Sequence, residues 1–372
     1  MSADYDVAVL GGGPAGCAAA LALRRHRVPR VLVAEASRYD AVRIGESIPP
    51  DAALLLAELG VWEEFLAEGH EPCLGSCSSW GADELGYNDF LFNPHGHGWH
   101  LDRRRFDAFL ARAAAAAGAE VRTATAFEGC APMSRGGFRL RLRAGGKGME
   151  ARARFVVDAT GPGARFARRQ GARRRVHDRL VCVVGFFELA PASRFSRLTF
   201  LEAVDEGWWY AARLPGARLA VALASDPEIV KAVGANREEG WLERLRSTRH
   251  LAAELAGAGF VAGSLAVSVA SSSRLDRAAG EDWVAVGDAA ATYDPISSQG
   301  VHKALADALR AAPAVAARLS GEGAGLGDYE AAVAARFDAY LANRDYFYSI
   351  ERRWPAAAFW RRRRRTARRN PR

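Results

Sequence analysis

Two glycine-rich stretches near opposite ends of the 372-residue chain constrain its fold most, and the first is Gly-Gly-Gly-Pro-Ala-Gly at residues 11–16. The apolar run Asp6–Leu10 precedes it and predicts a buried strand, and the alanine- and leucine-rich segment that follows predicts a helix. In such a turn, Gly11 permits the tight bend, Gly13 lets the backbone approach a pyrophosphate, and Gly16 lets the helix pack closely. The stretch therefore predicts a dinucleotide site, with the phosphates at the N-terminus of the helix.

A second apolar run, Val31–Ala34, ends in Glu35, which stands where an acid holds a ribose hydroxyl in such sites. The second glycine-rich stretch begins at Gly287-Asp288, directly after the strand-like run Val284–Val286. Between the two stretches, another strand-like run ends in Asp-Ala-Thr-Gly at residues 158–161. Because parallel strands deliver their following loops to one edge of a sheet, we expect one FAD site assembled from both ends of the chain.

The strand-like runs 121–127, 138–142 and 151–157 are separated by glycine-rich turns and predict a meander that returns the chain to the sheet. Residues 176–275 alternate strand signals with few helices and predict a second, antiparallel sheet. The predicted fold class is α/β: a Rossmann-like FAD-binding domain with an inserted antiparallel-sheet substrate domain. We expect the FAD-binding domain at 1–175 and 276–320, the substrate-binding sheet at 176–275, C-terminal helices at 321–353 and a basic tail at 354–372.

The net charge of +8 arises at the end of the chain, because residues 352–372 hold ten arginines and no acid, which leaves −2 for the rest. A nearly neutral body argues against nucleic-acid binding. The run Arg361–Arg365 could bind an acidic partner, a membrane surface or RNA, although a solvated, partly disordered tail is the simpler interpretation. No membrane span or secretory signal is visible, and the five cysteines are scattered, so we expect a cytoplasmic protein.

The motifs over residues 5–320 resemble those of flavoprotein monooxygenases with the para-hydroxybenzoate hydroxylase fold, and more narrowly the branch of flavin-dependent halogenases and geranylgeranyl-reductase-like enzymes. The resemblance implies that Arg103 contacts FAD, that Asp288 holds the ribityl chain, and that the segment 294–300 lies against the isoalloxazine ring. The cofactor-binding residues expected from the motifs and the resemblance are Gly11, Gly13, Pro14, Ala15, Gly16, Glu35, Arg43, Glu46, Ser47, Arg103, Asp158, Gly161, Gly287, Asp288, Pro295, Ser298, Gln299 and Gly300.

Two departures from the halogenase pattern argue against halogenation. Halogenases carry a Trp-x-Trp-x-Ile-Pro segment, whereas residues 207–215 here read Gly-Trp-Trp-Tyr-Ala-Ala-Arg-Leu-Pro. Halogenases also use a lysine that carries the activated halogen, and this chain has no lysine between residues 1 and 146. The segments 79–81, 92–103 and 207–210 are instead similar to maturation flavoproteins of lysine- and glycine-oxidase systems and of quinohemoprotein amine dehydrogenase, which hydroxylate a tryptophan of a partner protein to build a quinone cofactor.

The resemblance implies an FAD-dependent monooxygenase that hydroxylates an electron-rich aromatic, an indole or a phenol, through a C4a-hydroperoxyflavin. Dioxygen would be the oxidant, and NAD(P)H or a separate flavin reductase the electron source. The substrate would be a tryptophan of a partner protein or a natural-product intermediate. Three alternatives stay open: a saturase that reduces an isoprenoid-like substrate, a flavin-dependent halogenase, and a non-catalytic FAD-bound assembly factor.

The expected catalytic residues are two histidines and two aromatics. His97 or His100 could deprotonate the substrate, since a histidine titrates near neutral pH. Trp209 and Tyr210 lie on a predicted strand, where they face opposite sides, and one side could stack on an aromatic substrate. We expect no metal site, because no set of acids or cysteines at ligand spacing accompanies these histidines.

Overall fold

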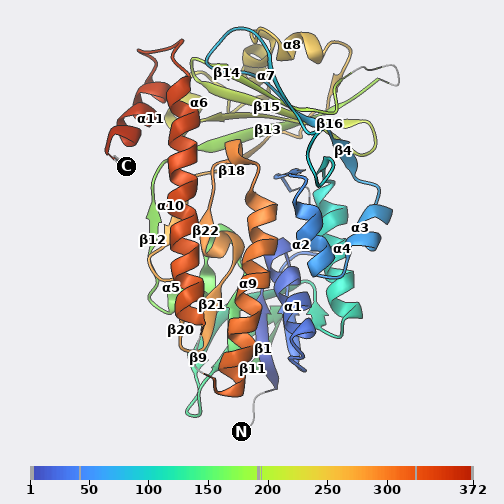
Figure 1. The fold of residues 1–372 in the computed structure, drawn as a ribbon, viewed down its shortest axis with the longest axis vertical. Helices are drawn as coiled ribbons and strands as arrows, with labels where there is room; N and C mark the ends of the chain where they lie inside the picture. Colours follow the sequence, from blue (N-terminus) through green and yellow to red (C-terminus); the bar gives the residue numbers. More distant parts are fainter. Residues whose placement is uncertain (1–3, 42, 191–192, 194, 323–324, 370–372) are drawn as a thin grey trace.

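A computed structural model describes residues 4–41, 43–190, 193, 195–322 and 325–369, with the backbone alone for 365–369. A largely parallel sheet flanked by helices forms the lower part of the molecule, and a largely antiparallel sheet forms the upper part (Figure 1). The long helix α10 (Leu326–Ile350) runs along both parts, beside α9 (Gly300–Ser320). The predicted α/β class with a second, antiparallel sheet is confirmed.

The lower sheet is built on four parallel strands in the order β2 (Val31–Ala34), β1 (Tyr5–Leu10), β11 (Lys147–Asp158) and β21 (Trp283–Ala285). Its edges are the parallel β8 (Glu120–Arg122) and the antiparallel β20 (Ala279–Gly280). The predicted meander is formed by β9 (Thr125–Pro132), β10 (Phe138–Ala144) and β11. The run 121–127 is two strands rather than one, because Ala124, with φ of 50°, turns the chain from β8 toward β9.

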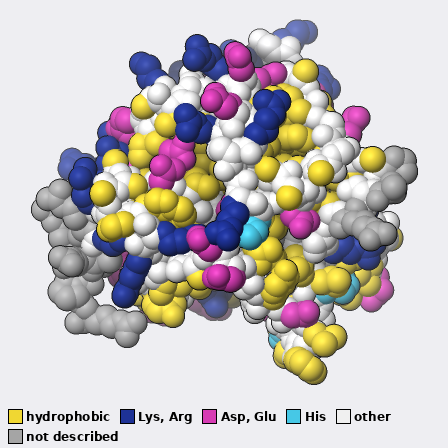
Figure 2. All heavy atoms as spheres, turned by 90° about the horizontal axis from the view of Figure 1, so that it is seen from above, with side chains coloured by type: hydrophobic (Ala, Val, Ile, Leu, Met, Phe, Trp, Pro, Cys, Tyr) yellow, Lys and Arg dark blue, Asp and Glu magenta, His cyan; other side chains and the backbone are white. Residues whose placement is uncertain are grey.

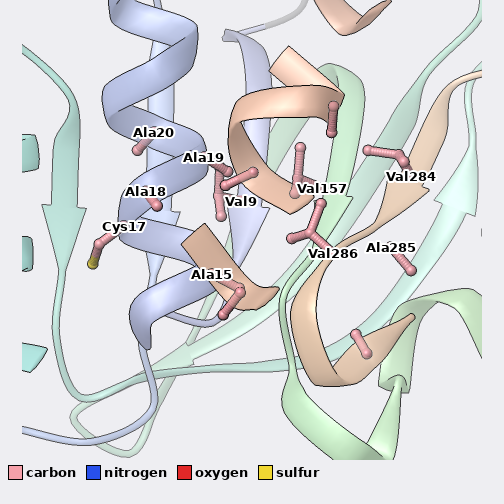
Figure 3. Packing of buried hydrophobic residues seen from close by; sticks show 14 of the residues in the cluster. Val9, Ala15, Cys17, Ala18, Ala19, Ala20, Val157, Val284, Ala285 and Val286 are labelled. Atoms are coloured by element: carbon pink, nitrogen blue, oxygen red, sulfur yellow. The ribbon is translucent and has the colours of Figure 1, made fainter. Parts of the chain in front are cut away.

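Helix α1 (Pro14–Arg25) packs on this sheet through small side chains. Its alanines at 15 and 18–20 are buried beside Val9, Val157 and the strand end at Val284–Val286 (Figure 3). On its other sides α1 lies against α9 and against α4 (Arg103–Ala116). Asp102 caps the N-terminus of α4, since its carboxylate accepts hydrogen bonds from the amides of residues 104 and 105.

The upper sheet contains eight strands, namely β17 (Gly259–Phe260), β13 (Val181–Glu188), β16 (Arg218–Ser225), β15 (Gly207–Leu214), β14 (Thr199–Val204), β5 (Gly75–Ser79) and β6 (Gly86–Asp89) in that order, with β18 (Ala266–Val269) beside β13. Because β5 and β6 come from residues 75–89, this sheet is not confined to the expected segment 176–275. Three short helices cover its outer face: α6 (Pro227–Ala232), α7 (Glu238–Arg246) and α8 (Leu251–Glu254).

Short elements join the two main sheets. One small sheet holds β3 (Ser47–Ile48), β7 (Gly98–His100) and β4 (Glu71–Cys73), and the other holds β12 (Arg174–Val176), β19 (Ser273–Leu275) and β22 (Ala291–Thr292). Helices α2 (Ala52–Glu58) and α3 (Trp62–Ala67) lie between β3 and β4 of the first, and α5 (Arg165–Arg169) precedes the second. Three single turns of 3-10 helix, η1 (Gly161–Gly163), η2 (Gly287–Ala289) and η3 (Pro295–Ser297), lie in the loops that the motifs occupy.

The C-terminal segment corrects two expectations. Residues 326–350 form one helix, α10, rather than two, and α11 (Ala358–Arg369) follows it. The side chains of Phe359 and Trp360 are fully buried, and Arg363 forms an ion pair with the buried Asp226. The expectation of a solvated tail is therefore wrong for residues 358–364, because α11 has an apolar face that packs on the protein. The side chain of Arg365 and residues 370–372 lie outside the described part of the chain.

The face seen from above the upper sheet carries positive and negative side chains close together, with apolar side chains between them (Figure 2). This face therefore offers no continuous basic surface of the kind that nucleic acids attract. Among the described helices, none combines the length and the apolar character that crossing a membrane would need.

Candidate functional site

The first glycine-rich turn leaves open space in front of α1. A Cβ atom on Gly11, which has φ of 102°, would overlap the carbonyl oxygen of Ala159, and one on Gly16 would overlap the carbonyl oxygen of Gly11. A Cβ atom on Gly13 would instead meet no atom within 4 Å. No side chain caps the N-terminus of α1, so its first amides face this space. The turn thus has the form that accepts a pyrophosphate.

The second glycine-rich stretch meets the first. A Cβ atom on Gly287, which has φ of 59°, would lie 2.6 Å from the Cβ atom of Ala15 at the start of α1. Turn η2, which begins at Gly287, also lies against η1 at Gly161. Segments from both ends of the chain therefore surround one space, as the motif order predicted.

Glu35 stands at the end of β2, and its carboxylate is buried. It accepts hydrogen bonds from the amide of Gly12 at 2.6 Å and from the amide and hydroxyl of Ser37 at 2.8 and 2.6 Å. Arg43 lies 3.5 Å away on the solvent side. Tyr39, which sequence reasoning missed, donates its hydroxyl to the carbonyl of Gly12 at 2.8 Å. These bonds fix the acid beside the phosphate-binding turn, at the place expected for a ribose contact.

Arg103 joins the two parts of the site. Its guanidinium group binds both carboxylate oxygens of Asp107 at 3.1 Å and the carbonyl of Ile44 at 2.6 Å. Burial is the largest single effect on the pKa of Arg103, and it lowers the pKa. The negative charges of Glu46 and Asp288 contribute to the opposing effects, and the pKa is raised overall. Arg103 therefore holds the Gly45-Glu46-Ser47 loop close to the second glycine-rich stretch.

Asp158 has a structural role that the sequence did not indicate. Its side chain is fully buried, and its two oxygens accept hydrogen bonds from Thr160 (amide and hydroxyl), Phe166 and Ala167. The carboxylate is thus used to hold η1 and the start of α5 in place. The side chain is therefore engaged within the protein, while the backbone that follows it lines the space behind Gly11, and the expected cofactor contact at residue 158 stays a prediction.

Asp288 is held by a lysine that sequence reasoning missed. Lys303, on the first turn of α9, is 5% exposed and donates to Asp288 at 3.2 Å. The next residues lead into η3 and then to the exposed start of α9, where Pro295, Gln299 and Gly300 face solvent. No signal in the sequence distinguishes Lys303 from an ordinary helical lysine.

The residues present fit FAD. The open space at Gly13, the uncapped start of α1 and the acid at Glu35 match a pyrophosphate and a ribose, and Asp288 stands on the opposite side of the turn. The start of α9 at 298–300 would direct its amides toward the flavin ring. Bound FAD would supply the redox chemistry, and the chain would supply position and polarity.

A buried polar cluster lies between the Gly45-Glu46-Ser47 loop and the inner face of the upper sheet. The Ser47 hydroxyl is 2.9 Å from the Tyr210 hydroxyl and 3.4 Å from that of Thr199, which in turn is 2.9 Å from Nε2 of His100. Glu46 lies next to the Tyr210 hydroxyl. The structure therefore brings together four of the expected site residues, and Thr199, which sequence reasoning missed, connects them.

Two groups in this cluster have unsatisfied atoms. Glu46 is 4% exposed, and its Oε1 atom has no hydrogen-bond partner among the described residues. Burial raises its pKa, against the smaller effect of its backbone hydrogen bonds and of Arg103. His100 is fully buried, its Nδ1 atom also lacks a described partner, and burial lowers its pKa to about 4. A neutral imidazole at His100 follows from this shift.

The inner face of the upper sheet is aromatic beside this cluster. The indole of the fully buried Trp208 donates to the Tyr348 hydroxyl at 3.0 Å, which donates to the Asp294 carboxylate at 2.7 Å. The ring of Trp80 packs edge-on against Trp208. Ile44 and Ile296, from the loops around the proposed flavin position, pack on the same cluster. The aromatic face and the cofactor space are therefore adjacent.

Asp294 should make the stability of the protein pH-dependent. Burial raises its pKa to about 6, above the value of 3.8 that it has when exposed. Between about pH 4 and pH 6 the carboxyl group of Asp294 is protonated in the folded protein but ionised in the unfolded chain. The free energy of unfolding therefore falls by about 1–3 kcal/mol as the pH rises through that window. In urea unfolding at a series of pH values, the Asp294→Asn variant should not show this decrease in the free energy of unfolding. Parallel curves for wild type and variant would contradict it.

Two expected catalytic residues lie elsewhere. Trp209 is fully buried on the outer face of the upper sheet, with its ring 5.1 Å from that of Trp241 of α7, because alternation along β15 turns it away from Tyr210. It therefore belongs to the core. His97 is half-buried, with Nδ1 2.8 Å from the carbonyl of Gly98 and its ring beside Trp99, and no contact connects it to the polar cluster. In the described part of the chain no group of three potential metal ligands occurs.

Fold and site together define a protein that binds FAD, and comparison with known proteins agrees. The family described as "FAD binding domain" matches residues 4–343, so the chain belongs to that family. A protein of Marinomonas mediterranea that is named as an FAD-dependent oxidoreductase, LodB, is 29% identical over 366 residues, 97% of each chain. The flavin-dependent halogenase armH3 of Armillaria mellea is 27% identical over 349 residues, which make up 85% of this chain and 68% of that protein.

Solved structures give the same class. The myxobacterial chondrochloren halogenase CndH, an FAD-dependent enzyme, superposes with a TM-score of 0.84 at 27% identity, over 96% of this chain and 85% of its own. The flavin-dependent halogenase CmlS gives the same TM-score and identity, over 96% of this chain and 67% of its own. The protein is therefore an FAD-dependent oxidoreductase with structural similarity to flavin-dependent halogenases.

Proposed function

We propose that this oxidoreductase is a monooxygenase that hydroxylates an electron-rich aromatic, an indole or a phenol. The observation that carries the proposal is the unsatisfied Oε1 atom of Glu46, buried beside the Tyr210 hydroxyl and next to the aromatic face at Trp208. A buried acceptor without a partner costs free energy unless a ligand satisfies it. A phenol O–H or an indole N–H would donate to it, and the ring would lie against the aromatic face.

The residues of the cluster have separate tasks in this account. Glu46 accepts the substrate donor, and its raised pKa lets the carboxyl group take up the proton that the ring releases. Ser47 and Thr199 hold the Tyr210 hydroxyl and the neutral His100 in place. The aromatic side chains around Trp208 keep water from the reacting ring. When bound, FAD would activate dioxygen, with electrons from NAD(P)H or from a separate flavin reductase.

The narrower proposal is that the aromatic is a tryptophan of a partner protein, hydroxylated on the way to a quinone cofactor. It is supported by the similarity to maturation flavoproteins in segments 79–81, 92–103 and 207–210. It is further supported by the relative LodB, which matches over nearly the full length of both chains, whereas the fungal halogenase matches over about two thirds of its own. A natural-product intermediate is the alternative substrate.

Halogenation is the second candidate, because several relatives and structural neighbours are halogenases. The chain has three lysines. Lys147 and Lys231 are exposed on the β10–β11 turn and on α6, and Lys303 is engaged by Asp288. None of the three contacts the polar cluster, so the lysine on which halogenases depend has no counterpart there.

A product assay separates the two candidates. The FAD-loaded protein is photoreduced and mixed with oxygenated buffer that contains bromide and one of three probes: indole, phenol or a tryptophan-containing peptide. Mass spectrometry should show a gain of oxygen that does not depend on bromide. A brominated product would replace the proposal by halogenation, and peroxide release without any altered probe would contradict both.

Glu46→Gln should lower the rate of product formation by at least about a hundredfold, the range of a lost general acid–base group. The amide has the same shape but cannot take up a proton, and FAD content should stay at the wild-type level because Arg103 binds backbone carbonyls of this loop rather than Glu46. Trp209→Phe serves as the control, since Trp209 lies on the other face and its loss should leave the rate unchanged. Equal rates for Glu46→Gln and wild type would contradict the assigned role.

A further inference from the structure

An open groove of about 860 Å³ on the lower part of the molecule is surrounded by arginines. It lies along α5 and the start of β12, on the same side of the molecule as α11 (Figure 1). The guanidinium-bearing residues around it are Arg165, Arg168, Arg169, Arg173 and Arg174, and the ring of Phe127 forms an apolar wall. The proposed catalytic cluster contains none of these residues.

The positive charge of this groove is not neutralised by ion pairs within the described part of the protein. None of its five arginines forms an ion pair with a carboxylate of the described residues, whereas Arg362 and Arg363 of the C-terminal run both pair with Asp226. Burial lowers the pKa of Arg174, the nearby acids Asp288 and Asp158 raise it, and the charge of Arg168 lowers it by a smaller amount. Like charges held together in this way favour an anionic partner.

Hydrogen bonds to backbone carbonyls also fix the positions of two of these arginines. Arg169 donates to the carbonyl of Glu128 at 2.7 Å and lies over the ring of Phe127. Arg174 donates to the carbonyls of Asp288 and Ala289 at 3.0 and 2.7 Å, while its Nε atom is buried without a described partner. A preorganised guanidinium loses less side-chain entropy on binding a carboxylate. Through Arg174, the groove contacts the turn that bears Asp288.

The strand next to the groove has an unpaired edge. β12 pairs with β19 on one side, and no described strand pairs with its other side. Its residues Arg175 and Val176 are exposed, the latter by 60%. A free edge of this kind accepts an extended peptide through main-chain hydrogen bonds, whereas a small anion cannot pair with a strand edge in this way. The combination of a free edge and unpaired arginines favours a polypeptide as the partner.

We propose that the arginine groove and the free edge of β12 form the docking site for an extended, carboxylate-rich segment of a partner protein. Main-chain hydrogen bonds to β12 would give the register, and the exposed guanidinium groups of Arg165, Arg168, Arg169 and Arg173 would bind the acidic side chains. This inference goes beyond the proposed reaction and does not depend on it. The sequence suggested the run 361–365 as a surface that could bind an acidic partner, and this proposal places that surface at the groove instead.

Fluorescence anisotropy with a labelled peptide of alternating glutamate and valine tests the docking site on the FAD-loaded, full-length protein. Binding should weaken as salt is added, and Arg168→Glu with Arg169→Glu should weaken it at least about tenfold, because both side chains are exposed and reversal leaves the fold intact. The matched control is Arg352→Glu with Arg361→Glu, the same charge change at two exposed arginines near the C-terminus, which should leave affinity unchanged. Bound peptide should also perturb the flavin absorbance through Arg174.

Three results would overturn the proposal. Equal loss of affinity in the groove variant and the control variant would mean that overall charge, not the groove, attracts the peptide. Displacement of the peptide by inorganic pyrophosphate at the concentration of the peptide itself would indicate a site for small anions. Unchanged binding of a peptide whose alternate amides are N-methylated would remove the role of the β12 edge.

Discussion

Replacing Gly13 with valine should strongly weaken FAD binding while the protein stays folded. The backbone of Gly13 is extended, with φ of −71°, and a Cβ atom there would meet no protein atom within 4 Å, so the fold tolerates the side chain. The same side chain would occupy the space in front of α1 where the pyrophosphate is expected. Filling a close-packed contact costs about 1–3 kcal/mol or more, so flavin affinity should fall by at least about fivefold and by more than about a hundredfold at the upper end of this range. Flavin absorbance per protein after purification measures the effect.

Two further glycines make this experiment specific. Gly148→Val is the matched control, because Gly148 also has open space around it but lies on the β10–β11 hairpin, away from the site, and should keep its flavin. Gly16→Ala should instead prevent folding, since its Cβ atom would overlap the carbonyl oxygen of Gly11. A Gly13→Val protein with full flavin content would show that the cofactor does not lie against this turn.

Replacing Trp360 with alanine should lower the free energy of unfolding by about 3–5 kcal/mol, the range for a large aromatic removed from a core. Trp360 is 1% exposed, packs edge-on against Trp80 at 5.4 Å, and donates its indole N–H to the carbonyl of Val204 at 2.8 Å. The variant loses the buried area and leaves the Val204 carbonyl without this donor. Urea unfolding followed by circular dichroism measures the difference.

Arg361→Ala is the control for this prediction, because the neighbouring side chain is exposed and should contribute within about 0.5 kcal/mol. If residues 354–372 were a solvated tail, the two variants would unfold at the same urea concentration as wild type. A large loss for Trp360→Ala alone would support α11 as part of the core of the upper sheet.

Features fixed by local chemistry could be predicted from the sequence. The need for glycine at positions 11, 13 and 16 can be recognised from a motif of six residues. The first half of the site can therefore be predicted from the sequence. The strand Val284–Val286 carries Gly287 to the same sheet edge because parallel strands end together. In each case the partners are close in sequence or are placed by one sheet.

Features fixed by contacts between distant segments could not be predicted. Alternation along β15 separates Trp209 from Tyr210, but only the docking of the sheet decides which face meets the cofactor. Thr199 enters the polar cluster from another strand, and nothing in its surroundings indicates this. The arginines of α11 dominated the charge pattern, yet Asp226 pairs with two of them, while five arginines without a described ion pair surround the groove at α5 and β12.

The most direct test of the account is the source of the oxygen in the product. The FAD-loaded protein is reduced in the absence of air, given an aromatic probe that it converts, and exposed to isotopically labelled dioxygen in unlabelled water. We expect one labelled oxygen atom in each hydroxylated product and no product without dioxygen. Product that forms without dioxygen, as a saturase would give, or oxygen drawn from water, would contradict the assignment as a monooxygenase.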